Sequence, residues 1–167
     1  LMGKHSNIIF CQPDMTIIDS IKHISANVSS VREVLPGRPY FIAETQHKLN
    51  PLEINEETFI GEVLSQPLSV GKAIYTMITG ISPLIAEEFC FRASIDSGAS
   101  TKALSELEQL HLYRTFEKLK EDIIEHRYKP NIVSDEGTPT EFSSTQLTCY
   151  GELQEEDFDS ISEVLRY

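Results

Sequence analysis

The stretch Ile78–Ala93, which reads ITGISPLIAEEFCFRA, constrains the fold more than any other part of the chain because it joins two helices. Ser82 is a favourable N-cap, since its hydroxyl oxygen can accept a hydrogen bond from a backbone N–H group of the first turn. Pro83 then occupies the first helical position, where its missing N–H group costs nothing. Gly80 can adopt the left-handed conformation that closes the preceding helix. The pattern therefore predicts a helix-hairpin-helix element.

The loop formed by Gly80, Ile81 and Ser82 is a candidate backbone site for phosphate. Its N–H groups and the positive end of the second helix would converge on one point. The alternative is a packed helical turn that contacts only its own core. Hairpins that bind nucleic acid usually carry a second glycine where this chain has Ser82, and the sequence leaves both interpretations open.

The spacing of apolar residues changes along the chain. β-branched residues on both sides of Gln12-Pro13-Asp14 predict a β-hairpin over residues 7–11 and 15–21. The prolines and Gly37 within Leu35–Tyr40 predict a rigid turn. After Pro51 the spacing becomes helical. The expected helices span residues 56–65, 69–79, 82–92 and 105–127.

The longest of these helices carries an apolar stripe. Leu112, Phe116, Leu119 and Ile123 are separated by steps of four, three and four residues, so they should share one buried face. Pro130 is expected to stop this helix.

A second β-hairpin is expected around Asp135-Glu136-Gly137, with strands over residues 131–134 and 140–150 and a short acidic helix after them. Together these patterns predict an α+β chain in three parts. Residues 1–52 form a β-containing part, residues 53–130 a helix-hairpin-helix region, and residues 131–167 a β-hairpin with a short helix.

Charge restricts where nucleic acid could bind. The 167 residues carry a formal net charge of −12, but residues 1–50 hold five Lys or Arg against four Asp or Glu. The remainder therefore carries −13, and acidic surfaces repel phosphate. We expect any RNA-facing surface to lie in the first third of the chain or at the backbone of the hairpin. Lys4, His5 and Arg38 are the favoured side chains, and Lys48 is a weaker candidate.

Residue chemistry favours a binding or scaffolding module over an enzyme. The sequence has no nucleophile elbow, phosphate loop or HExxH motif, and its five histidines are scattered. Glu87 and Glu88 are neighbours on one helix and point in different directions, so we expect them to complement the positive helix end. No Cys/His spacing resembles a metal site, and no cofactor is expected.

Cysteine usage and hydropathy indicate the cellular compartment of the protein. Cys11 and Cys90 lie in apolar runs and are predicted to be buried free thiols, which fits a reducing compartment. No apolar run approaches the roughly 20 residues of a membrane span, and no signal-peptide pattern is present. Because position 1 is not Met, the chain is interpreted as an interior piece of a longer protein.

Five separated blocks together resemble the NFACT family, whose members include the bacterial FbpA/RqcH proteins and eukaryotic NEMF. The blocks are MGKHSNII at Met2–Ile9, LPGRPY at Leu35–Tyr40, KLNPL at Lys48–Leu52, GISPLIAEEFCFRA at Gly80–Ala93 and EHRYKPNIV at Glu125–Val133. They occur in the family's order and rough spacing. The resemblance implies the later part of the NFACT-N domain followed by the helix-hairpin-helix region, and it implies no glycosylase activity.

The resemblance also implies a function. Family members bind large ribosomal subunits that carry stalled peptidyl-tRNA, recruit tRNA and drive C-terminal tailing of the nascent chain, with alanine in bacteria. Such a factor is cytoplasmic. The MGKHSN block follows the family's tRNA-facing region, so Met2, Lys4 and His5 inherit a contact role. The alternative is a surface adhesin without a signal peptide, because several Gram-positive members are described as binding fibronectin or fibrinogen.

Overall fold

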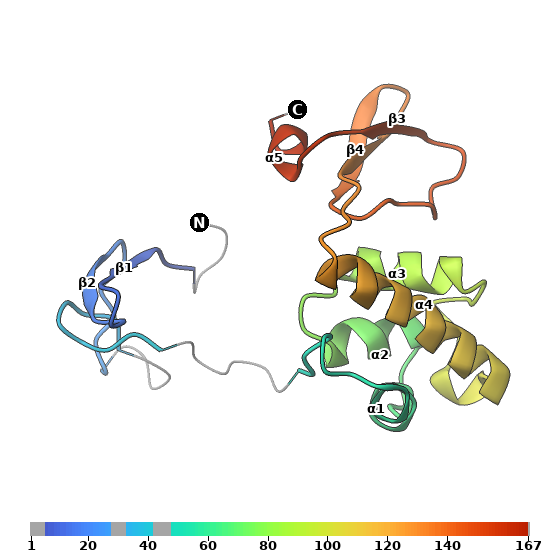
Figure 1. Ribbon diagram of the computed structural model, residues 1–167, viewed down its shortest axis with the longest axis horizontal. Helices are drawn as coiled ribbons and strands as arrows, with labels where there is room; N and C mark the ends of the chain where they lie inside the picture. The colour runs from blue at the N-terminus through green and yellow to red at the C-terminus, as the bar shows by residue number, and fades with distance from the viewer. Residues whose placement is uncertain (1–5, 28–32, 42–47, 167) are drawn as a thin grey trace. The chain divides into compact units, whose positions relative to one another are not determined.

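The computed structural model of the protein describes residues 6–27, 33–41 and 48–166. Residues 1–47 and 48–167 form two compact units, each of which is described by itself (Figure 1). Helices and strands are mixed in the chain, so the predicted α+β class is confirmed. The division into three domains stays a prediction.

The first unit is built on the β-hairpin that the Pro-Asp turn predicts. Strand β1 (Ile9–Cys11) pairs antiparallel with β2 (Ile17–Ser20), and both strands are shorter than expected. Met15 takes a φ of 66° in the turn, and its N–H group donates to the Gln12 carbonyl at 2.9 Å.

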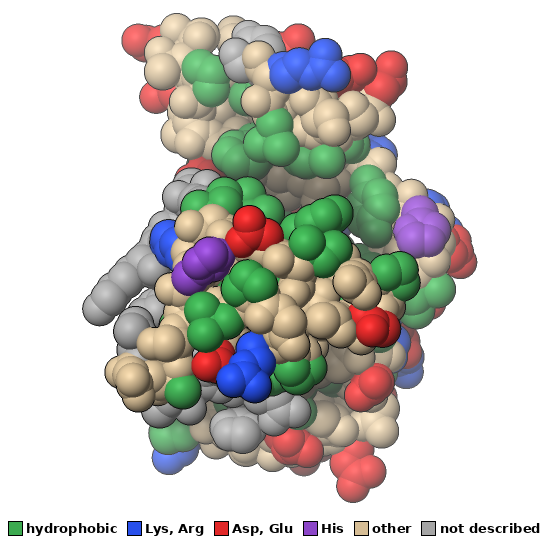
Figure 2. Space-filling model, turned by 90° about the vertical axis from the view of Figure 1, so that its left-hand side faces the viewer, with side chains coloured by type: hydrophobic (Ala, Val, Ile, Leu, Met, Phe, Trp, Pro, Cys, Tyr) green, Lys and Arg blue, Asp and Glu red, His purple; other side chains and the backbone are tan. Residues whose placement is uncertain are grey.

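The segment Leu35–Tyr40 runs beside β2 and is held there by its backbone. The Ile17 N–H group donates to the Arg38 carbonyl and the Gly37 N–H group donates to the Ile17 carbonyl, both at 2.8 Å. Gly37 has a φ of 78°, which glycine adopts without strain. The predicted rigid turn is confirmed at this position. Figure 2 shows hydrophobic side chains on the surface of this part of the molecule.

The helices of the second unit agree with the predicted spans within a few residues, except that the first is short and continues as a π-helical turn. They are α1 (Glu56–Thr58), the π turn η1 (Phe59–Val63), α2 (Val70–Met77), α3 (Pro83–Arg92), the 3₁₀ turn η2 (Thr101–Ala103) and α4 (Glu106–Ile124).

Helix α4 begins with a capping box, in which the Ser105 hydroxyl accepts from the Glu108 N–H group and the Glu108 carboxylate accepts from the Ser105 N–H group. It ends at Ile124, several residues before the proline that was expected to stop it. His126 takes a left-handed φ of 55°, and the Arg127 N–H group donates to the Asp122 carbonyl at 2.8 Å. This is a Schellman motif, so the expected role of Pro130 was wrong.

The apolar stripe of α4 forms the centre of the helical core. Leu112, Phe116 and Leu119 are buried as predicted, whereas Ile123 is only half-buried at the end of the helix. The Phe116 ring stacks on Phe59, with ring centroids 5.1 Å apart. The core therefore joins α4 to η1, and further side chains of α2 and α3 complete it.

The C-terminal part of the second unit is a three-stranded antiparallel sheet with the order β4-β3-β5. It comprises β3 (Asn131–Asp135), β4 (Thr138–Ser143) and β5 (Gln154–Asp157), and the short helix α5 (Ile161–Val164) follows. Glu136 and Gly137 join β3 to β4 with φ values of 47° and 79°.

Two sequence expectations for this region were wrong. The second strand ends at Ser143 instead of continuing to residue 150, and the third strand β5 was not predicted. The four residues of β5 read QEED and are all exposed. They lack the β-branched residues and the apolar alternation by which a strand is recognised, so only pairing with β3 reveals it.

The cysteines only partly fit the expectation of buried free thiols. All three are free, and Cys90 is buried, but Cys11 is only half-buried. Burial raises the pKa of the Cys90 thiol to about 12, and Glu87 and Asp96 add to the shift. Within the described residues, the longest and most apolar helices fall short of what a membrane crossing requires.

Candidate nucleic-acid interface

The hairpin between α2 and α3 is shaped by a segment far from it in the sequence. Helix α2 ends at Met77, because Ile78 is extended and pairs in parallel with Leu49. The Leu49 N–H group donates to the Met77 carbonyl at 2.7 Å, and the Thr79 N–H group donates to the Leu49 carbonyl at 2.9 Å. Gly80 has a φ of 79° but lies beyond this pairing, so it turns the loop and does not itself close α2.

The start of α3 follows the predicted capping pattern. The Ser82 hydroxyl accepts a hydrogen bond from the Ile85 N–H group at 3.2 Å, and Pro83 is the first helical residue. Ile81 is buried in the helical core, as the packed-turn alternative requires.

The same loop also offers unused backbone donors. Gly80 and Ser82 are exposed. The backbone N–H groups of residues 80–82 have no hydrogen-bond partner within the part of the chain that the structure describes. Three neighbouring donors beside a helix N-terminus suit an oxyanion such as phosphate. Phosphate binding at this loop stays a prediction.

Lys48, which the sequence suggested as an RNA contact, has a structural role. Its ammonium group donates to the Tyr75 carbonyl at 2.8 Å and so occupies one of the free carbonyl groups at the end of α2. A cation at a helix C-terminus also interacts favourably with the helix dipole. The fold thus places Lys48 at the end of α2, where its ammonium group is bound to a helix carbonyl.

The other predicted contact residues lie in the first unit. The Arg38 guanidinium forms an ion pair with Glu33 at 2.9 Å and remains largely exposed. Met2, Lys4 and His5 lie outside the described residues. Lys48 therefore lies at the end of α2, beside the hairpin, while Arg38 belongs to the other compact unit.

Sequence reasoning missed a buried carboxylate on α3. Glu88 is 1% exposed. It accepts hydrogen bonds from the Thr148 N–H group at 2.7 Å, the Thr148 hydroxyl at 2.6 Å and the Cys149 N–H group at 2.8 Å. Arg92, one helical turn further on, donates to Glu88 at 2.5 Å and to the Gln146 carbonyl at 2.6 Å. This pair fixes the segment after β4 against α3.

The environment of Glu88 keeps it ionised. Burial alone would raise the pKa of its carboxyl group, but the hydrogen bonds from Thr148, Arg92 and Cys149 outweigh burial and lower the pKa below its ordinary value. The expectation that Glu88 complements the N-terminus of its helix was wrong, because its carboxylate binds Thr148 and Cys149. Glu87, its neighbour on the helix, is exposed. The available signal was the i, i+4 spacing of Glu88 and Arg92 in an otherwise apolar helix.

Within residues 6–27, 33–41 and 48–166, no group of three or more His, Cys, Asp or Glu side chains is placed to hold a metal ion. Glu88 and Arg92 of α3 contact the protein's own backbone, and the donors at the hairpin are backbone N–H groups. The geometry therefore suits anion binding at the hairpin and structural use of the buried acid.

By fold, the chain is an α+β protein of a kind already seen in solved structures. The fibrinogen binding protein from Staphylococcus aureus superposes with a TM-score of 0.73 over 99% of this chain and 55% of its own, at 24% identity. The N-terminal part of the fibronectin/fibrinogen-binding protein from Streptococcus suis superposes with a TM-score of 0.57 over 99% of this chain and 52% of its own, at 25% identity.

The chain belongs to the NFACT family, as the five sequence blocks indicated: residues 1–167 match the family described as NFACT N-terminal and middle domains. The relative "Rqc2 homolog RqcH" of Bacillus subtilis (strain 168) is 34% identical over 166 residues, which are 99% of this chain and 27% of that protein. The protein of the same name in Streptococcus suis (strain 05ZYH33) is 34% identical over 58% of this chain and 17% of its own length. The chain thus spans less than a third of these relatives.

Proposed function

We propose that the chain is part of a ribosome-associated quality-control factor. In the full-length protein it would help to bind tRNA and large ribosomal subunits that carry stalled peptidyl-tRNA, and the whole factor would promote C-terminal alanine tailing of the nascent chain. The observation that carries this proposal is the similarity to RqcH along nearly the whole chain. The factor would act in the cytoplasm.

Within this role the chain would bind without catalysing a reaction of its own. Glu88, the most buried acid among the described residues, is occupied by hydrogen bonds to residues 148 and 149 and is not free to act as a base. The unused donors at Gly80, Ile81 and Ser82 are backbone groups, which bind anions but cannot exchange protons usefully. Reproducible hydrolase, nuclease or glycosylase turnover by the purified chain, abolished by one point mutation, would contradict this.

The RNA contacts would come from the first unit and the hairpin. Arg38 is exposed although it pairs with Glu33, so its guanidinium could exchange that surface partner for a phosphate at little cost. Lys4 and His5 are assigned to the same role by the family resemblance.

The test is made in the full-length protein with Lys4→Glu combined with Arg38→Glu. Co-sedimentation with large ribosomal subunits should weaken, and binding should depend less steeply on salt because two phosphate contacts are removed. The matched control is Lys72→Glu with Lys102→Glu, which alters two exposed lysines by the same charge. Circular dichroism checks the fold. Equal co-sedimentation of the double variant and the control would mean that this surface does not contact RNA.

The second candidate is a surface adhesin that binds fibronectin or fibrinogen. It is favoured by the solved structure from Streptococcus suis that is described by that activity. The three-stranded sheet has β4 and β5 at its two edges, and an extended peptide could add a strand there. Retention of the intact protein on washed cells together with fibronectin would support this role, whereas co-sedimentation with ribosomal subunits would support the first.

A further inference from the structure

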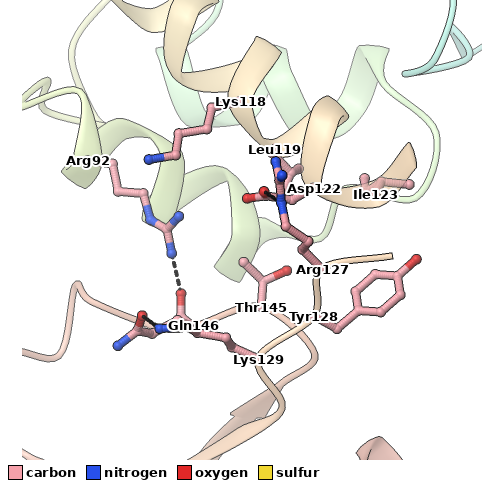
Figure 3. Close-up of a pocket in the computed structure, with 10 residues that line it drawn as sticks. All are labelled: Arg92, Lys118, Leu119, Asp122, Ile123, Arg127, Tyr128, Lys129, Thr145 and Gln146. Carbon is pink, nitrogen blue, oxygen red and sulfur yellow. Dashed lines mark hydrogen bonds and ion pairs between the residues drawn. The ribbon is translucent and has the colours of Figure 1, made fainter. Parts of the chain in front are cut away.

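A hollow of about 460 Å³ lies where α3 and α4 face residues 127–129 and 145–146 (Figure 3). Its lining includes the basic residues Arg92, Lys118, Arg127 and Lys129, and one carboxylate, that of Asp122. The whole sequence has 14 Lys and Arg against 26 Asp and Glu. Four of those 14 basic residues therefore gather in one hollow.

The two guanidinium groups of this basic hollow are paired with carboxylates. Arg127 is held by Asp122 at 2.9 Å and also by Glu125. The charge of Arg92 is balanced by Glu88. These pairs hold the two guanidinium groups at fixed positions in the lining.

The two lysines differ from the arginines. Lys118 is exposed and has no hydrogen bond or ion pair within the described part of the chain. Lys129 donates only to the neutral Gln146 side chain, at 3.3 Å. Both ammonium groups therefore keep a positive charge that no carboxylate balances.

The basic lining continues along α4. A neighbouring hollow of about 390 Å³ shares Arg92 and Lys118 with the first and adds His111 and Arg114. The Arg114 guanidinium pairs with Glu117 at 2.6 Å, so the unbalanced charge is that of Lys118, which lines both hollows and can meet a ligand with repeated negative charges.

We propose that the basic hollow binds the phosphodiester backbone of RNA, with Lys118 and Lys129 as its phosphate contacts. This inference rests on the proposed function, which brings the protein to tRNA and ribosomal RNA, and it names a contact surface within it. Arg92 and Arg127 each keep one terminal guanidinium nitrogen without a partner in the described residues, and these can donate to the same phosphates.

The chemistry of the lining favours RNA backbone over a base-specific or apolar ligand. The basic side chains recognise phosphate, which carries no sequence information, so binding should be indifferent to sequence. Tyr128 at the rim is 48% exposed and offers an aromatic face on which an unpaired base can stack.

The experiment uses the full-length protein that contains this chain and fluorescein-labelled tRNA, with binding followed by fluorescence anisotropy at several salt concentrations. The test variant is Lys118→Glu with Lys129→Glu. The control is Lys72→Glu with Lys102→Glu, which makes the same change in net charge at exposed lysines outside the hollow.

Loss of two phosphate contacts should weaken binding at least about tenfold near 0.1 M salt and reduce the slope of log K against log salt by about 1.5. The control should stay within about twofold of the unaltered protein. Lys118→Glu alone alters an exposed side chain that makes no hydrogen bond or ion pair within the described residues, so it should leave the fold intact and give about half of the slope change.

A second measurement needs no variant. Acetylation of surface lysines, mapped by mass spectrometry, should slow at Lys118 and Lys129 when tRNA is added but not at Lys72 or Lys102. If the unaltered protein binds tRNA, and the test variant binds like the control with no lysine protection, this site is overturned while the proposed function stands. If the unaltered protein binds neither tRNA nor ribosomal subunits, the proposed function fails and this site fails with it.

Discussion

The two compact units of the chain are held together by different forces. In the first unit, Ile17 and Val34 are the buried apolar side chains among the described residues, while Phe10 is 66% exposed. Its order comes from backbone hydrogen bonds between β1, β2 and the segment at Leu35–Tyr40. The second unit has a continuous core of nineteen buried residues. A two-stranded hairpin with little buried apolar surface is only marginally stable, whereas a core of that size can support a fold.

Similar residues contribute differently in the two units. Phe116 lies at the centre of the core on α4, whereas Phe10 on β1 and Ile18 on β2 lie at the surface. A lysine or an acid likewise has a role set by its surroundings, as Lys48 and Glu88 show. The following predictions test this difference.

The largest expected effect is the loss of a core ring. Phe116→Ala should lower the free energy of unfolding of the second unit by about 3–5 kcal/mol, because the ring is 1% exposed and contacts both Phe59 and Phe89. Phe10→Ala, the matched change in the first unit, should stay within about 0.5 kcal/mol. Urea unfolding followed by circular dichroism measures both. Equal effects would remove the distinction between the units.

Glu88→Gln should cost about 3 kcal/mol, because the amide group would present donors to the Thr148 and Cys149 N–H groups and leave Arg92 without its charge partner. Glu87→Gln on the same helix is the control, and it should change stability by less than about 0.5 kcal/mol because Glu87 is exposed. A cost below about 1 kcal/mol for Glu88→Gln would show that the segment after β4 is not held by this carboxylate.

The pH dependence of stability should follow from the same group. The pKa of Glu88 is lowered in the folded protein from its ordinary value of 4.5, so its stabilising contribution is complete above that value and is lost as the pH falls through the folded pKa. The difference in stability between the unaltered protein and Glu88→Gln should therefore shrink as the pH falls below 4.5. Thermal melts at a series of pH values measure it, and a difference that is constant with pH would contradict the assignment.

The smallest expected effect concerns the capping lysine. Lys48→Met keeps the aliphatic stem but removes the hydrogen bond to the Tyr75 carbonyl, and it should cost about 1 kcal/mol. Lys72→Met on the exposed side of α2 is the control, with an expected change near zero. If Lys48→Met leaves stability unchanged but weakens ribosome binding, Lys48 is an RNA contact instead of a cap.

Much of the local structure was predictable from the sequence. The first hairpin, the Ser82-Pro83 start of α3 and the apolar stripe of α4 were placed correctly, since each depends on neighbouring residues only. The end of α4 was placed too late, because a left-handed histidine at position 126 carries no compositional signal comparable to glycine. The contact residues Arg38 and Lys48 were chosen by charge, but charge alone does not show that a lysine already caps a helix.

The fold class, the family and the caps and turns could be predicted from short-range patterns and from blocks shared with relatives. Contacts between distant residues were needed to show that β5 is a strand, that Glu88 fixes a segment sixty residues away, and that four basic residues of an acidic region meet in one hollow. The net charge of residues 51–167 argued against phosphate binding there. Net charge is a sum along the chain, whereas a ligand meets only the charges that folding brings together in space.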